Sequence, residues 1–237
     1  MTGGRHIPHR SIKAPIFPNS IWRVLHAKLD FLRSLCPFVA KNTSVSQSPL
    51  ILASASPRRR ELLGQLGIAF EVITADIDEH DAQSAPHLTP VELARDNALR
   101  KAQAVADLNP ARWVLGADTV VARDGHLLGK PSSLDEAGKF LRLLSGHVHE
   151  VTTGCVLIAP DSAAEVFHEI SRVTFRVLSG DTIKRYLAAV NVLDKAGAYA
   201  LQEHGDWIIE GVDGSRANVI GLPVELLEKV LLRHGLL

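Results

Sequence analysis

Residues 50–63, LILASASPRRRELL, indicate the fold class, because a short apolar run leads directly into a helix start. The run 50–53 predicts a buried strand, and Ser56 followed by Pro57 predicts a helix with its cap at the serine. Arginines 58–60 then occupy the first turn, where free N–H groups and the helix dipole are already positive. Such a turn is typical of a phosphate site, although the arginines could equally be solvated or paired with acids such as Glu61.

The alternation of strand and helix continues to the end of the chain. Capping signals at Thr89 and Ser133 predict helices that run to Ala106 and Leu144. A hairpin turn at 124–125, and strands 148–158 and 166–177 around a polar turn, exclude an all-parallel sheet. We therefore expect an α/β fold with a mixed sheet. The other expected elements are helices 57–66 and 181–189, strands 70–73 and 113–121, short strands after residue 189 and a C-terminal helix from Pro223.

Charge is distributed unevenly along the chain. The total is balanced, with 26 basic and 26 acidic residues, but residues 1–48 contain seven Lys or Arg and only one acid. Residues 49–237 therefore hold 19 basic and 25 acidic residues. A net-acidic domain is a poor binder of DNA or RNA, so clustered arginines within it favour a small phosphorylated ligand.

The chain divides into an N-terminal extension, 1–48, and a domain, 49–237. The extension is basic, contains four prolines and has a partly amphipathic piece at 21–32, which is the composition of a transit peptide. We favour a disordered tail or a start site placed too far upstream over a targeting segment. Two cysteines, Cys36 and Cys155, form no disulfide framework, so we expect a reducing compartment, the cytoplasm, and no apolar run reaches membrane-spanning length.

The most informative single residue is Asp118, which interrupts an otherwise apolar strand. Burying a carboxylate is costly unless it binds something, so Asp118 is a candidate to hold a divalent cation or to accept a proton from water. Pairing with a core arginine, or capping of a turn, would be the structural alternative. Glu79 is a second acidic candidate, in an acidic loop, and Lys130 and Lys195 are candidates for a cleft or for ordinary surface positions.

Six motifs in order resemble the Maf family of nucleoside triphosphate pyrophosphatases. They are SASPRRRELL, GADTVV, LGKP, LSGHVHEVTTG, DKAGAYALQ and NVIGLPVELL, and they extend from residue 50 to about residue 227. The resemblance implies a long twisted mixed sheet with flanking helices and two lobes around a cleft, similar to inosine triphosphate pyrophosphatase. It also implies a reaction that requires Mg²⁺ or Mn²⁺ and converts a nucleoside triphosphate and water into the monophosphate and pyrophosphate.

The resemblance assigns roles to individual residues. Asp118 matches the family's proton acceptor. As acidic residues, Asp118 and Glu79 are also our candidates to hold the divalent cation. The positions tied to substrate choice match the branch that acts on dTTP and UTP, rather than the branch that prefers 7-methyl-GTP; they are Arg58, Thr119 and Gln202. The positions that line the family's cleft and would bind phosphate are Ser54, Ser56, Arg59, Lys130 and Lys195. Glu203 and Arg216 depart from the family pattern, where glycine and tyrosine are common.

These matches predict a hydrolase that acts on a small-molecule nucleotide, including modified pyrimidine nucleotides, without a nucleic-acid polymer or a membrane. A homodimer is expected by analogy only. The alternative from another class is a nucleotide-binding regulator of septum formation and cell division, with incidental hydrolysis. Sugar-nucleotide transfer would require an acceptor-site motif, and we find none.

Overall fold

The structure is a computed structural model that describes residues 48–237. The predictions for the extension 1–48, and for Cys36 within it, fall outside this range except at Ser48, and they stay predictions. In the described part of the chain, no helix combines the length and the apolar character that crossing a membrane demands.

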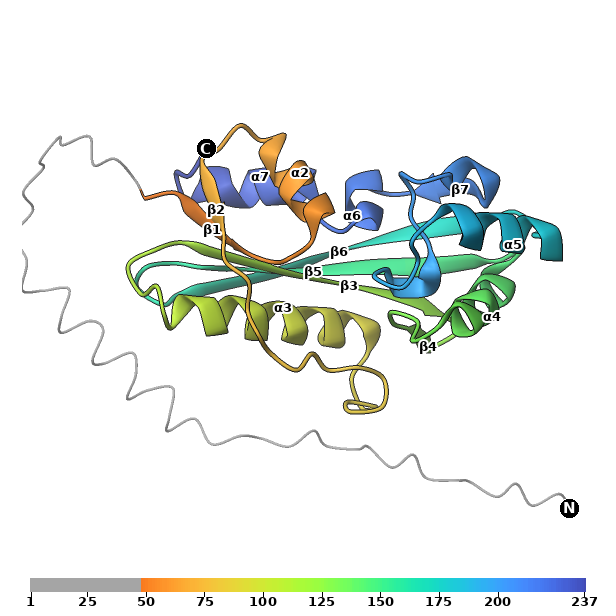
Figure 1. Ribbon diagram of the computed structural model, residues 1–237. Coiled ribbons are helices and arrows are strands. Elements are labelled where there is room, and N and C mark those ends of the chain that lie inside the picture. Colours follow the sequence, from red (N-terminus) through yellow and green to blue (C-terminus); the bar gives the residue numbers. More distant parts are fainter. Residues whose placement is uncertain (1–47) are drawn as a thin grey trace, which may run out of the picture. The chain divides into compact units, whose positions relative to one another are not determined.

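The described residues form one mixed seven-stranded sheet with helices on both faces (Figure 1). The strand order is β2-β1-β3-β5-β6-β7, and β4 pairs with β3 as an antiparallel hairpin. Strand β1 is parallel to both β2 and β3, whereas every pairing from β3 onward is antiparallel. The sheet is therefore mixed, as the sequence predicts. The strands are β1 (Leu50–Ala53), β2 (Phe70–Val72), β3 (Val114–Arg123), β4 (His126–Leu128), β5 (Val148–Ile158), β6 (Ala164–Phe175) and β7 (Ile209–Asp213).

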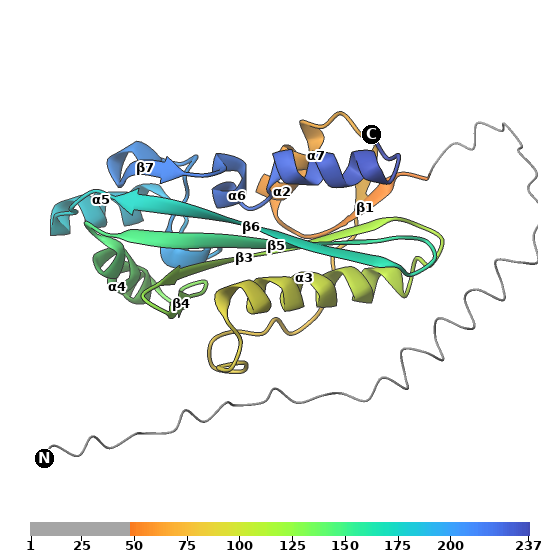
Figure 2. The ribbon, with the colours of Figure 1, turned by 180° about the vertical axis from the view of Figure 1, so that it is seen from behind.

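The helices cover the sheet in two layers, which both ribbon views show (Figures 1 and 2). Helix α3 lies along one face, against β3 and β5, while α2 and α7 lie on the other. Strand β1 serves both layers, because its successive side chains point to opposite faces. The helices are α2 (Pro57–Gly64), α3 (Pro90–Ala106), α4 (Leu134–Leu144), α5 (Gly180–Ala189), α6 (Arg216–Ile220) and α7 (Val224–Arg233), with short 3₁₀ helices η1 (Ala196–Ala198) and η2 (Gly205–Trp207).

Two hydrophobic regions occupy opposite ends of the sheet. At one end, α2 and α7 pack on one face of β1 and β3, and the alanine-rich side of α3 packs on the opposite face of the same strands. At the other end, α4 and α5 enclose a core built around Phe175 and Tyr186. The long strands β5 and β6, of 11 and 12 residues, connect the two ends (Figure 1). These two lobes correspond to the expected architecture.

Most predicted boundaries agree with the structure to within two residues. The caps at Ser56 and Thr89 form as predicted, and the hairpin turn has positive φ at Asp124 and Gly125. The second capping box is only half correct, because the Glu136 carboxylate accepts hydrogen bonds from Ser132 rather than from the cap residue. Only one of the short strands expected after residue 189 forms, as β7, and the sequence analysis missed helix α6.

Candidate active site between the two lobes

A cleft of about 320 Å³ opens at the junction of α2, β3 and the segment 194–202. It is lined by every residue that the sequence analysis selected as a site candidate: Ser54, Ser56, Arg58, Arg59, Glu79, Asp118, Thr119, Lys130, Lys195 and Gln202. Residues from 53 to 221 contribute to its walls. The structure therefore brings the ten candidates together, while the role of each stays a prediction.

Asp118 lies in the middle of β3 and is only 7% exposed. Its charged partner is Lys101 of α3, whose Nζ lies 2.7 Å from Asp118 Oδ1. The alternative to a functional role for Asp118 was a pair with a core arginine, and the structure shows a lysine instead. The same ammonium group lies 3.0 Å from Glu79 Oε1. One buried lysine therefore joins the two carboxylates that the sequence analysis considered as metal ligands.

Glu79 comes from the long loop between β2 and α3. Its partial burial on its own would raise the pKa of its carboxyl, but the positive charges of Lys101 and Lys130 more than offset this and hold the pKa below its ordinary value. Lys130 approaches to 3.8 Å, and its side chain is 59% exposed. This lysine can therefore reach a ligand in the cleft at little cost in desolvation.

Arg59 connects three parts of the cleft. Its guanidinium group donates from Nη1 to Ser54 Oγ at 3.2 Å, from Nη2 to Thr119 Oγ1 at 3.0 Å and from Nε to the Gly221 carbonyl at 2.8 Å. Burial lowers the pKa of Arg59, and the nearby carboxylate of Asp118 opposes that shift. A guanidinium group has five N–H donors, so two remain for a phosphate.

The arginines of the first helical turn fit both interpretations of that turn, as phosphate ligands and as solvated or acid-paired side chains. Arg58 and Arg59 line the cleft beside the N–H groups of α2, whereas Arg60 is exposed and lies outside it. Arg58 is also paired with an acid, since its Nη1 lies 3.1 Å from Asp194 Oδ2. The acid is on the opposite wall of the cleft rather than at Glu61.

Lys195 is more strongly engaged than the sequence suggests. Its side chain is only 5% exposed, and its ammonium group donates to the Asn191 carbonyl and to Asp194 Oδ1 at 2.9 Å. The same group lies 3.3 Å from Glu203 Oε1, as an ion pair. A phosphate that binds at Lys195 therefore competes with these two carboxylates.

The hydroxyl of Thr119 has one free position. It accepts from Arg59, and it donates to Thr153 Oγ1 at 3.0 Å, because the Thr153 hydroxyl itself donates to the Asn218 carbonyl. A hydroxyl has one donor and two acceptor positions. Thr119 therefore has one lone pair left, which could accept a hydrogen bond from a ligand.

Three residues that contact site side chains are not among the predicted candidates: Lys101, Asn97 and Asp194. The signal for the first two is present in α3, where Asn97 and Lys101 occupy the buried face among alanines. Polar residues on the apolar face of an amphipathic helix need buried partners. His149 of β5 contacts the Tyr199 hydroxyl at 2.8 Å in the core, whereas His147 is exposed and precedes the strand. The described residues contain no group of three or more His, Cys, Asp or Glu that could hold a metal ion.

Comparison with known proteins identifies relatives of this chain. The model of the family described as Maf-like protein matches residues 49–234. The dTTP/UTP pyrophosphatase of Akkermansia muciniphila is 46% identical over 183 residues, which are 77% of this chain and 95% of the relative. The corresponding protein of Myxococcus xanthus is 46% identical over 81% of this chain and 96% of its own length. That of Nitratidesulfovibrio vulgaris is 42% identical over 84% and 93%.

Solved structures with similarity to the chain are more distant. The Ham1 protein of Staphylococcus aureus superposes with a TM-score of 0.45 and is 17% identical, over 79% of this chain and all of that protein. A HAM1 protein from Coxiella burnetii gives the same TM-score and identity over 78% and 98%.

Proposed function

The chain belongs to the Maf-like protein family, and on that premise we propose that it is a nucleoside triphosphate pyrophosphatase that hydrolyses dTTP and UTP. The relatives named above carry that activity in their names, at 42–46% identity over most of both chains. The observation that carries the proposal is that buried Asp118 and the cationic start of α2 line the same cleft.

The triphosphate would lie between α2 and the two lysines of the opposite wall. Free N–H groups at the start of α2, the two unused donors of Arg59 and the exposed ammonium group of Lys130 provide its positive surroundings. Arg58 would exchange Asp194 for a phosphate oxygen. These groups would hold the chain of phosphates in line for attack at the α-phosphorus.

Asp118 would act as the base. Each of its carboxylate oxygens has one protein donor, from Lys101 and Asn97, and retains an acceptor position for water. The water oxygen attacks the α-phosphorus, the bond from the α-phosphorus to the bridging oxygen of pyrophosphate breaks, and Asp118 takes the proton of the water. The products are the nucleoside monophosphate and pyrophosphate.

The acidic groups of the cleft fit a hard divalent cation. Glu79 and Asp118 provide carboxylate oxygens on either side of Lys101, and Mg²⁺ commonly binds through one or two carboxylates together with substrate phosphates. We propose that these two residues hold Mg²⁺ or Mn²⁺. When bound, the cation neutralises phosphate charge and stabilises the leaving pyrophosphate.

Base selection would depend on Gln202 and Thr119. The exposed amide of Gln202 lines the cleft and can both donate and accept, which suits the O4 and N3–H edge of uracil or thymine. Thr119 can accept a hydrogen bond from N3–H through its remaining lone pair. It cannot donate to O4, because its hydroxyl hydrogen is already donated to Thr153.

We also propose a cytoplasmic location and, by analogy, a homodimer. A role as a septum regulator is not favoured, since the relatives are named for hydrolysis.

The test is a panel of triphosphates: UTP, dTTP, CTP, GTP, 7-methyl-GTP and modified pyrimidines, each assayed for pyrophosphate with Mg²⁺ or Mn²⁺. We expect UTP and dTTP to be turned over many times per protein molecule. Asp118→Asn should lower that rate by about 10² to 10⁴-fold, while the surface control Asp135→Asn keeps it. Near-normal turnover by Asp118→Asn would remove Asp118 from the role of base, and stoichiometric binding without pyrophosphate release would favour a regulator.

A further inference from the structure

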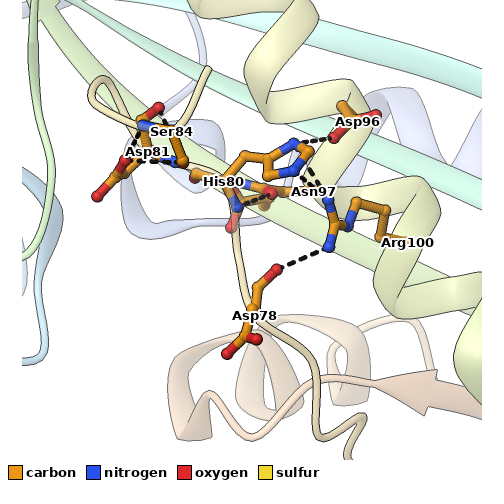
Figure 3. Close-up of polar contacts among 8 residues, drawn as sticks. Asp78, His80, Asp81, Ser84, Asp96, Asn97 and Arg100 are labelled. Carbon is orange, nitrogen blue, oxygen red and sulfur yellow. Dashed lines mark hydrogen bonds and ion pairs between the residues drawn. The ribbon is translucent and has the colours of Figure 1, made fainter. Parts of the chain in front are cut away.

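The loop between β2 and α3 has no helix or strand over residues 73–89, yet it delivers Glu79 to the cleft. Such a loop needs tertiary contacts to hold one position. Figure 3 shows these contacts, which join the loop to the side of α3 through His80 and Asp78. They begin one residue away from Glu79 on either side.

Asn97 forms the central contact. Its Oδ1 accepts a hydrogen bond from the His80 backbone N–H at 2.8 Å, and its Nδ2 donates to the His80 carbonyl at 2.9 Å (Figure 3). The amide thus pairs with both backbone polar groups of one loop residue. Asn97 itself is only 2% exposed, so loss of its side chain would remove from the interior the partner of both backbone groups of His80.

The same amide also contacts Asp118, the proposed general base. Asn97 Nδ2 donates to Asp118 Oδ2 at 3.3 Å, while Lys101 holds the other oxygen of that carboxylate. An amide nitrogen has two hydrogens, and the two contacts use both. Aspartate has no hydrogen to donate when ionised, so the arrangement specifically requires an amide.

A second set of contacts holds the loop against α3 without involving Asp118. Arg100 donates to the Asp78 carbonyl at 2.9 Å and contacts the imidazole of His80, which also lies 2.9 Å from the Asp96 carboxylate (Figure 3). Arg100 has no contact with Asp118 among the described residues. The two contacts therefore differ in a way that an experiment can exploit.

We propose that Asn97 is a positioning residue, which fixes the loop carrying Glu79 to α3 and orients Asp118, so that both carboxylates meet across Lys101. This inference rests on the proposed function, because it concerns the same site. Asn97 does not line the cleft itself. Its effect is therefore on the rate of the chemical step rather than on substrate binding.

The experiment combines steady-state hydrolysis of UTP with amide hydrogen exchange on the full chain. In Asn97→Ala we expect kcat to fall by about 10- to 100-fold with little change in KM, and exchange at residues 78–81 to accelerate. Arg100→Gln should accelerate the same exchange with a smaller loss of kcat. Asn109→Ala is the matched control, since Asn109 is also an asparagine that donates to a backbone carbonyl, that of Val105, away from the cleft.

The proposal would be overturned if Asn97→Ala had the same kcat as the Asn109→Ala control. It would also be overturned if KM rose while kcat stayed at the wild-type value. Unchanged exchange at residues 78–81 would overturn the role in fixing the loop. If Asn97→Ala does not fold, Asn97→Asp decides, because it keeps the size and the acceptor for the His80 N–H but loses the donor to Asp118; normal kcat in that variant would overturn the proposal. Absence of turnover by the wild-type protein would instead refute the proposed function, while the exchange measurement would still test the loop contact.

Discussion

Gly154→Ala offers the most direct test of how the sheet positions the site. Gly154 of β5 pairs with Asp118 of β3, and helix α3 crosses directly over it. A Cβ atom at this position would lie 2.5 Å from the Ala94 carbonyl carbon and 2.6 Å from Arg95 N, both of them backbone atoms of α3. Since ordinary contact begins at 3.4 Å, the helix must move away by close to 1 Å.

That displacement has two measurable costs. Overpacking of this kind destabilises a protein by about 1 to 3 kcal/mol. The helix also carries Lys101, whose ammonium group lies 2.7 Å from Asp118 Oδ1. Misplacement of a catalytic group by 1 Å can lower the rate by roughly 100-fold, so we expect kcat/KM for UTP to fall to about 1% of its wild-type value in Gly154→Ala.

The assays are urea unfolding and pyrophosphate release from UTP. Gly211→Ala is the matched control, because Gly211 also lies in a strand but has open space around its Cβ position. We expect the control to keep activity and to be as stable as the wild type or slightly more so. Wild-type kcat/KM in Gly154→Ala, with or without lost stability, would refute the claim that close contact between α3 and the sheet sets the geometry of the site.

Three further predictions follow from the charges of the structure. Glu203→Gln removes an anion that is paired with Lys195, so KM for UTP should fall by about two- to fivefold. The exposed control Glu228→Gln should leave KM unchanged, and a higher KM in Glu203→Gln would contradict this. Burial, with a smaller effect of a nearby arginine, lowers the pKa of His149 from 6.5 to about 4. The unfolded chain therefore takes up this proton first as the pH falls below 6.5, and about 2 kcal/mol of stability should be lost between pH 7 and pH 5. Urea unfolding of wild type and His149→Gln at both pH values measures this, and an equal loss in the two proteins would exclude His149 as its source. Excess chelator should stop pyrophosphate release and added Mg²⁺ or Mn²⁺ should restore it, and full activity in chelator would argue against a metal requirement.

The sequence predicts the local structure of this chain well, because its strong signals act over a few residues. The serine cap before Pro57, the capping box at Thr89 and the Asp124–Gly125 turn each involve neighbouring groups, and all form. The second box at Ser133 fails in detail because Ser132, one residue upstream of the cap, donates its backbone N–H and its hydroxyl to the Glu136 carboxylate instead.

Long-range pairings in the site could not be predicted in the same way. Asp118 pairs with Lys101 because α3 crosses β3 at one particular position along the strand. No local sequence pattern specifies that position. The pairing of Arg58 with Asp194 joins residues 136 positions apart. By contrast, Asn97 and Lys101 could have been selected as unusual polar residues on an apolar helix face, although their partners could not.

The contact of Arg59 with the Gly221 carbonyl has a consequence for synthesis of the protein, since 162 positions separate the two residues. A growing chain still on the ribosome has made the arginines of α2 long before it reaches the opposite wall of the cleft. Helix α7, which covers the same apolar layer as α2, is made later still. A nascent or truncated chain that stops before residue 221 therefore lacks part of the cleft wall, and we expect the proposed hydrolysis to begin only after these residues have been made.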